Sequence, residues 1–173
     1  MVSMYNSWIT FTVCCMVLTK CEIIYLGASS PYMEFRNIEQ QESKLVWIKG
    51  CKDGVVGLFE SVNISSLVFE LVIGGWGNTI TAIRIHSPIN SQVYARDKML
   101  MLIPNEYTPF WIKWTRTTVY IRPGTIDNNG PVIQWTRNDT ISIRYMAFRT
   151  GTQCPLKYAL DLSCSRVDVT RHA

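Results

Sequence analysis

Histidine is scarce in this chain of 173 residues: only His86 and His172 occur, and they lie far apart in the sequence. No two cysteines have the CxxC spacing, so the ligand patterns typical of zinc sites are missing. No serine or cysteine is placed as a recognisable nucleophile beside His86. The sequence therefore predicts neither a metal site nor a set of catalytic residues.

Runs of basic residues are missing as well. The 17 Lys and Arg are scattered among 13 Asp and Glu, which leaves a formal net charge of +4. A nucleic-acid partner would require a clustered basic stripe, so we expect no nucleic-acid binding. No internal repeat or low-complexity tract occurs, and 47% of the residues are hydrophobic. This composition suits one compact domain, which we place at residues 22–173.

No apolar run approaches the roughly 20 residues of a membrane-spanning helix. The longest is "WITFTVCCMVL", eleven residues that end just before Thr19 and Lys20. It fits the hydrophobic region of a secretory signal peptide, although no Lys or Arg precedes it. We therefore expect residues 1–21 to be a signal peptide, cleaved after Thr19 or Cys21, and the mature chain to be secreted without a membrane span. A buried strand or a short anchor is the alternative.

Secretion places the remaining cysteines in an oxidising compartment. Cys51, Cys154 and Cys164 stay with the mature chain, and Cys21 stays if cleavage follows Thr19. Because Cys154 and Cys164 bracket a short segment, we expect a disulfide between them. Cys51 would then pair with Cys21 or remain free.

Two N-x-S/T sequons occur, at Asn63 and Asn138. Both fall between expected strands, where an attached sugar chain would reach solvent. Together with the signal peptide they predict a glycoprotein.

Helical periodicity is nearly absent. Short alternating or apolar runs recur instead, separated by Gly, Pro, Asn and Asp. The stretch 87–109, with three prolines, indicates an irregular connection. Short strands without helices predict an all-β fold, an antiparallel β-sandwich resembling a jelly roll. The expected strands are 43–49, 54–60, 67–73, 78–86, 110–115, 118–122, 131–136 and 140–149, with further strands near 32–36 and within 156–160.

One stretch, "FELVIGGWGNTITAIRI" (residues 69–85), raises the question of a cofactor loop, because three glycines follow a strand. A phosphate-binding glycine loop leads into a helix, whose N-terminus binds the anion. Here the residues after the glycines are β-branched and alternating, which indicates a second strand. We therefore interpret Gly74–Gly77 as a hairpin turn.

The expected register of this hairpin decides where its charged residues lie. A four-residue loop would pair Ile73 with Asn78, which places Arg84 towards the far end of the core face. Glu70 would then fall on the opposite, partly solvated face.

The same stretch carries a family resemblance. "VIGGWGNTITAIRI", preceded by "LVWIKGCKDGVVGLFES" and followed by "FWIKWTRTTVYIRPG" and "VIQWT", resembles the farnesoic acid O-methyltransferase domain over about residues 45–151. The Gly-Gly-Trp turn and the Phe-Trp-Ile strand are the specific parts of the match. The chain departs from the family near its end. Such domains often finish with a glycine-rich segment and a Trp, whereas this chain has "FRTGTQCPLKYALDLSC", with cysteines and no Trp.

The family name implies methyl transfer from S-adenosylmethionine to farnesoic acid, which yields methyl farnesoate in the arthropod juvenile hormone pathway. The family also includes secreted proteins, and the chain resembles a secreted, arthropod-type, single-domain member. Because the glycine loop is expected to be a hairpin, we expect no S-adenosylmethionine cofactor here.

Three residues are candidates for ligand binding. Trp76, between two glycines, could stack on a sugar or an apolar ligand, or close the end of the sandwich as a plug. Trp111 is expected on an outer face beside Lys113, as a lectin-like surface or packed under an edge loop. Arg84 could bind a ligand carboxylate or pair with Glu60, Glu70 or Asp97.

Oxygen-rich side chains at residues 127–130 could accept calcium, but a hairpin loop is the simpler interpretation. The sequence thus favours a secreted module that binds a glycan, a small apolar ligand or a protein without catalysis. The alternative is the S-adenosylmethionine-dependent O-methyltransferase of the family name. A third class is a purely structural or venom-type secreted protein.

Overall fold

The computed structural model describes residues 22–86, 91–97, 101–124, 132–151 and 154–160, and for residues 86 and 91–97 only the backbone. The expected signal peptide, the turn at residues 127–130, Cys21, Cys164 and His172 lie outside the described residues.

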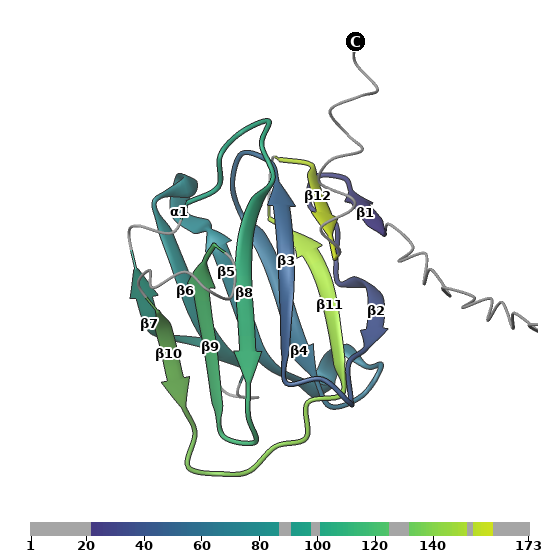
Figure 1. Cartoon of the computed structure of the whole chain (residues 1–173), viewed down its shortest axis with the longest axis vertical. Coiled ribbons are helices and arrows are strands. Elements are labelled where there is room, and N and C mark those ends of the chain that lie inside the picture. The colour runs from purple at the N-terminus through teal and green to yellow at the C-terminus, as the bar shows by residue number, and fades with distance from the viewer. Residues whose placement is uncertain (1–21, 87–90, 98–100, 125–131, 152–153, 161–173) are drawn as a thin grey trace, which may run out of the picture.

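Two antiparallel sheets of six strands each pack face to face, as the front and back layers of Figure 1 show. Sheet A contains, in spatial order, β1 (Ile23–Leu26), β12 (Leu156–Ala159), β3 (Ser43–Lys49), β8 (Thr108–Trp114), β9 (Thr118–Pro123) and β10 (Ile133–Thr136). Sheet B contains β2 (Met33–Asn37), β11 (Tyr145–Thr150), β4 (Gly54–Phe59), β5 (Leu67–Gly74), β6 (Ile80–His86) and β7 (Ser91–Asp97). A one-turn helix, α1 (Gly75–Asn78), and a 3-10 turn, η1 (Ile64–Ser66), complete the described elements. The predicted all-β antiparallel sandwich is confirmed.

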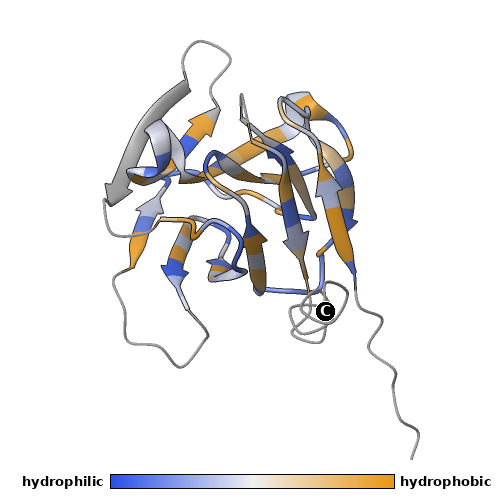
Figure 2. Ribbon diagram, turned by 90° about the horizontal axis from the view of Figure 1, so that it is seen from above, coloured by the Kyte–Doolittle hydropathy of each residue, from blue (hydrophilic) through white to orange (hydrophobic). Residues whose placement is uncertain are grey.

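Alternating side chains explain why these segments form strands in two layers. In β3, Val46 and Ile48 are buried while their neighbours are half-buried, and β8 repeats the pattern. The inward set meets the inward set of sheet B to form one continuous core. In Figure 2 bands of hydrophobic and hydrophilic residues alternate along the strands. Each fully buried large side chain contributes about 1.5–3 kcal/mol to the free energy of folding.

Three strand predictions differ from the structure. β7 lies inside the stretch expected to be irregular, because the prolines flank the strand instead of interrupting it. β1, with four residues, is too short to show a recognisable alternation. β11 begins only at Tyr145, because the Ile141 amide donates to the Arg116 carbonyl at 2.8 Å instead of to a neighbouring strand.

The Tyr158 side chain ties the two sheets together inside the core. It comes from β12 of sheet A, is fully buried, and its hydroxyl accepts a hydrogen bond from the Val55 amide of sheet B at 2.9 Å. The hydroxyl donates to the Arg149 carbonyl at 2.7 Å. Burial raises the pKa of Tyr158 well above its ordinary value, so the hydroxyl keeps its proton and both bonds.

One disulfide joins the ends of two neighbouring strands of sheet A. Cys51 follows β3, Cys154 precedes β12, and their Cα atoms lie 6.1 Å apart. The predicted Cys154–Cys164 pair is therefore wrong, because Cys154 is bonded to Cys51. The pairing of β12 with β3 brings the two cysteines together from 103 residues apart, which a short-loop argument from sequence does not anticipate.

No helix among the residues that the structure describes is long and apolar enough to cross a membrane.

Candidate functional site on the outward face of sheet B

The β5–β6 hairpin has a different register from the expected one, and the difference moves Arg84. Leu71 lies opposite Ile83, and Glu70 lies opposite Arg84. The hairpin prediction is confirmed, but the register is shifted by three residues, because the turn lies later than expected and the ladder is irregular between the pairs Gly75–Ile80 and Val72–Ala82. An odd shift exchanges the two faces of the second strand. Arg84 therefore lies on the outward face with Glu70, and its predicted place on the core face is wrong.

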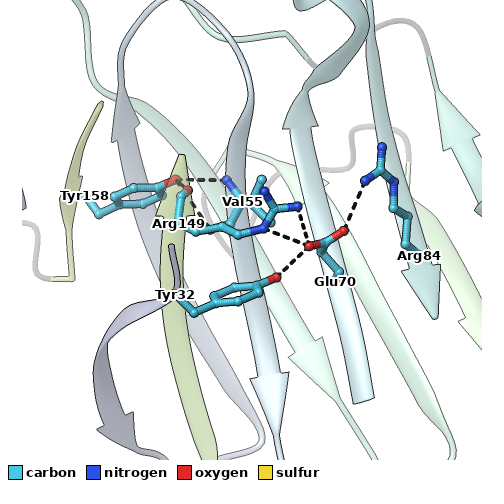
Figure 3. A network of polar contacts seen from close by, with 6 residues as sticks. All are labelled: Tyr32, Val55, Glu70, Arg84, Arg149 and Tyr158. Atoms are coloured by element: carbon cyan, nitrogen blue, oxygen red, sulfur yellow. Dashed lines mark hydrogen bonds and ion pairs between the residues drawn. The ribbon is translucent and has the colours of Figure 1, made fainter. Parts of the chain in front are cut away.

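Glu70 is the centre of a polar network on this face (Figure 3). Its side chain is only 2% exposed. Oε1 accepts hydrogen bonds from Nε and Nη2 of Arg149 at 2.9 and 2.6 Å, and Oε2 accepts one from Nη1 of Arg84 at 3.2 Å. The Tyr32 hydroxyl donates to Oε1 at 2.8 Å. Of the three pairings considered for Arg84, the one with Glu70 is confirmed.

The network fixes the ionisation states of its members. Burial alone would raise the pKa of Glu70, but the charge and hydrogen bonds of Arg149, the Tyr32 hydroxyl and Arg84 together hold its pKa below the ordinary value. Burial and the neighbouring Glu70 carboxylate raise the pKa of Tyr32. Two guanidinium groups surround one carboxylate, so the network carries a net positive charge at neutral pH.

Gly57 makes room for the Tyr32 ring. A Cβ atom at Gly57 would lie 2.6 Å from the Tyr32 ring and 2.5 Å from the Phe59 ring. Only glycine allows the tyrosine, which comes from the segment before β2, to lie across the sheet and reach Glu70. The ring of Tyr32 also packs edge-on against Phe59, with the ring centroids 5.0 Å apart.

Trp76 extends the network towards solvent. It lies in α1 at the end of the hairpin, in the left-handed conformation with a φ of 51°, and 47% of its surface is exposed. The Arg84 guanidinium lies 5.0 Å from the centre of its ring, a cation–π contact. Trp76 is therefore a half-exposed aromatic side chain beside a cation that Glu70 holds in place.

Trp111 lies on the other side of the molecule, on the outward face of sheet A. It is half-buried beside Lys113, whose ammonium is 5.9 Å from the ring centre, and the Arg122 guanidinium is 4.6 Å away. Its placement on an outer face next to Lys113 is confirmed. The structure therefore brings Trp76 and Arg84 together and separates Trp111 from both.

The remaining candidate sites are a metal centre, a hollow at the surface and the two glycosylation sequons. No group of three potential metal ligands occurs among the described residues. A hollow of about 800 Å³ lies at one end of the sandwich, where Glu39, Glu42 and Glu60 line it together with Arg116. Asn63 and Asn138 are both exposed in loops.

Two members of the network, Arg149 and Tyr32, are absent from the sequence candidates. The alternation of buried Met146 and Phe148 could have placed Arg149 on an outward face. No sequence signal places β11 and the segment before β2 beside β4 and β5, and the network depends on that order.

Comparison with known proteins gives the family and the fold. The family model described as farnesoic acid O-methyl transferase matches residues 27–163, so the chain belongs to that family. No curated protein matches the chain by sequence.

Solved structures of galectins share the architecture. Chicken galectin 2 is similar with a TM-score of 0.53 and 11% identity over 73% of this chain and 99% of the galectin. A double variant of human galectin-16 has a TM-score of 0.54 and 7% identity over 76% and 96% of the two chains. Toad ovary galectin in complex with thio-digalactose has a TM-score of 0.50 and 8% identity over 72% and 98%. At these identities the likeness establishes a galectin-like β-sandwich fold.

Proposed function

We propose that this chain is a non-catalytic carbohydrate-binding module and that it binds glycans on the outward face of sheet B, at Trp76 and Arg84. Of the three ligand classes that the sequence leaves open, a glycan fits this site best. We also propose that the protein is secreted and glycosylated at Asn63 and Asn138. The Cys51–Cys154 disulfide supports an oxidising compartment.

The observation that carries this proposal is the pairing of an exposed indole with a fixed guanidinium. A sugar ring has an apolar face of C–H groups, which can stack on an aromatic ring, and hydroxyls, which accept hydrogen bonds. Trp76 offers the ring, and Arg84 offers N–H donors on a guanidinium whose central carbon lies 5.0 Å from the ring centre. Because Glu70 holds Arg84 in place, little side-chain entropy is lost when a ligand binds.

The fold supports the same ligand class. One of the galectins with this architecture was solved with thio-digalactose, a disaccharide analogue, so the sandwich can present a sugar site. Thio-digalactose is therefore the first probe to use.

The test is a glycan-array screen with the full-length protein produced by secretion, followed by calorimetry with the strongest ligand. Trp76→Ala and Arg84→Gln should each weaken binding at least tenfold, which corresponds to about 1.4 kcal/mol. Tyr25→Ala is the matched control, because Tyr25 is 65% exposed but belongs to sheet A. Equal affinities for wild type, Trp76→Ala and Arg84→Gln would refute this site.

The alternative is methyl transfer to farnesoic acid, which the family description suggests. The hollow at the end of the sandwich does not suit an acidic substrate, because the carboxylates of Glu39, Glu42 and Glu60 outnumber the one cation, Arg116, on its lining. We keep the prediction that the protein does not bind S-adenosylmethionine. A dissociation constant below about 100 μM in calorimetry, worth more than roughly 5 kcal/mol, would contradict it.

A further inference from the structure

The polar network around Glu70 holds one more positive than negative charge. Arg84 and Arg149 are each paired with Glu70, but one carboxylate neutralises only one of the two guanidinium charges. Tyr32, the fourth member, is neutral at pH 7, because burial and the Glu70 carboxylate raise its pKa. A negatively charged group that approaches this face therefore meets a net attraction.

The two guanidinium groups do not use the same edges. Arg149 donates from Nε and Nη2, its side-on fork, to Oε1 of Glu70. Arg84 donates one hydrogen bond, from Nη1 to Oε2 (Figure 3). Nε and Nη2 of Arg84 have no hydrogen-bond partner among the described residues, and 29% of the side chain is exposed. Arg84 therefore keeps a side-on fork that can donate two parallel hydrogen bonds to a carboxylate.

The turn that carries Trp76 is fixed by side-chain hydrogen bonds. Nδ2 of Asn78 donates to the Leu102 carbonyl at 2.8 Å, and its Oδ1 accepts from the Leu102 amide at 2.9 Å. The Thr79 hydroxyl donates to the Trp76 carbonyl at 2.8 Å. These bonds hold the backbone of the turn, and the indole lies beside the Arg84 guanidinium. A ligand that contacts both groups therefore orders little of the protein when it binds.

We propose that the site at Trp76 and Arg84 selects acidic sugars, which carry a carboxylate, as uronic and sialic acids do. The inference rests on the proposed glycan site and names the class of sugar that it prefers. The C–H face of the sugar stacks on the indole, while the carboxylate accepts from Nε and Nη2 of Arg84. A planar carboxylate matches the planar fork of a guanidinium. Glu70 lies beneath this fork, is 2% exposed, and its charge is neutralised by the network.

The experiment measures by calorimetry how tightly the full chain, produced by secretion, binds two pairs of saccharides. One pair is sialyllactose and lactose, and the other is tri-galacturonate and galactotriose with the same linkages. In at least one pair the acidic saccharide should bind at least tenfold more tightly than the neutral one, which corresponds to about 1.4 kcal/mol.

The variant Arg84→Lys tests the fork separately from the charge. It keeps the positive charge beside Glu70 but cannot donate two parallel hydrogen bonds, so the preference for the acidic saccharide should fall at least fivefold. The matched control is Arg116→Lys. Arg116 is exposed in the connection between β8 and β9, at the end of the sandwich away from α1 (Figure 1), and its replacement should leave both affinities unchanged.

Four outcomes would overturn the proposal. Equal affinities within both pairs, with binding still lost in Trp76→Ala, would refute the acidic preference and leave the glycan site standing. A full preference in Arg84→Lys would show that charge suffices without the fork. Tighter binding of 6-sulfated galactotriose than of tri-galacturonate would identify sulfate as the selected anion. Binding of farnesoic acid but of no saccharide would refute the glycan site and the acidic preference together.

Discussion

The two sheets hold their outer strands in different ways. In sheet A a covalent bond, Cys51–Cys154, joins β3 to the end of the chain that forms β12. In sheet B a buried carboxylate, Glu70, binds Arg149 of β11 and the Tyr32 hydroxyl before β2. The first link depends on redox state and the second on protonation. The outward faces of the two sheets also differ. On sheet B the charged side chains converge on one carboxylate, whereas the described strands of sheet A have cations and no carboxylate on their outward face.

The largest effect is expected from the covalent link. Replacing both cysteines, as Cys51→Ala with Cys154→Ala, should lower the free energy of unfolding by about 2–5 kcal/mol. The reason is that the bond closes a loop across 103 residues and restricts the unfolded chain. Urea unfolding of both proteins, with and without reductant, measures the change. Wild type in reductant should match the variant, and an unchanged midpoint would show that the bond contributes nothing.

Removing the buried carboxylate comes next. Glu70→Gln should lower the free energy of unfolding by about 1–3 kcal/mol, because it leaves the partly exposed guanidinium of Arg149 without its counter-charge. The matched control is Asp139→Asn, which breaks the exposed pair with Arg137 at 2.6 Å and should not change stability measurably. Equal losses in both variants would show that burial does not strengthen the Glu70 network.

Acid should erase the difference between wild type and Glu70→Gln. The pKa of Glu70 is lower in the folded protein than the ordinary value of 4.5, so its contribution is complete above that value. The contribution is lost as the pH falls through the lowered pKa, where the protonated side chain resembles Gln. Unfolding free energies measured from pH 7 to pH 2 should converge. A gap that stays constant down to pH 2 would contradict the ionised network.

Sequence reasoning recovers the class of fold because alternation is a local property. The runs that became β3, β4, β5, β6, β8 and β9 each show it, and the β-branched residues after Gly77 correctly predict that a strand follows the glycines. The register of the β5–β6 hairpin is harder to predict, since it depends on where the turn lies and on the regularity of the ladder beside it. A later turn and one extra residue between the pairs Gly75–Ile80 and Val72–Ala82 were enough to exchange the faces and move Arg84 beside Glu70.

The spatial order of the strands across the two sheets could not be predicted from the sequence. Arg149 reaches Glu70 only because β11 lies next to β4, and Cys154 reaches Cys51 only because β12 lies next to β3. Both contacts join segments about 80 to 100 residues apart, with separations of 79 and 103. Local patterns cannot supply them, so the candidate list contained Trp76 and Arg84 but neither Arg149 nor Tyr32.

The smallest change in stability is expected at Trp76, where the effect on binding should be large. Trp76→Gly relieves the cost of a left-handed φ of 51°, about 1–2 kcal/mol for a residue with a side chain. It also loses the cation–π contact with Arg84, about 0.5–1 kcal/mol, and adds flexibility to the unfolded chain at a similar cost. These terms nearly cancel, so the free energy of unfolding should stay within about 1 kcal/mol of wild type while glycan binding is lost.

Trp111→Gly, in the half-buried position on sheet A, should instead destabilise the protein clearly, because packing is removed without any relief of strain. Urea unfolding and glycan titration on both variants measure this contrast. If Trp76→Gly unfolds as easily as Trp111→Gly, the indole of Trp76 holds the fold together and is not available to a ligand.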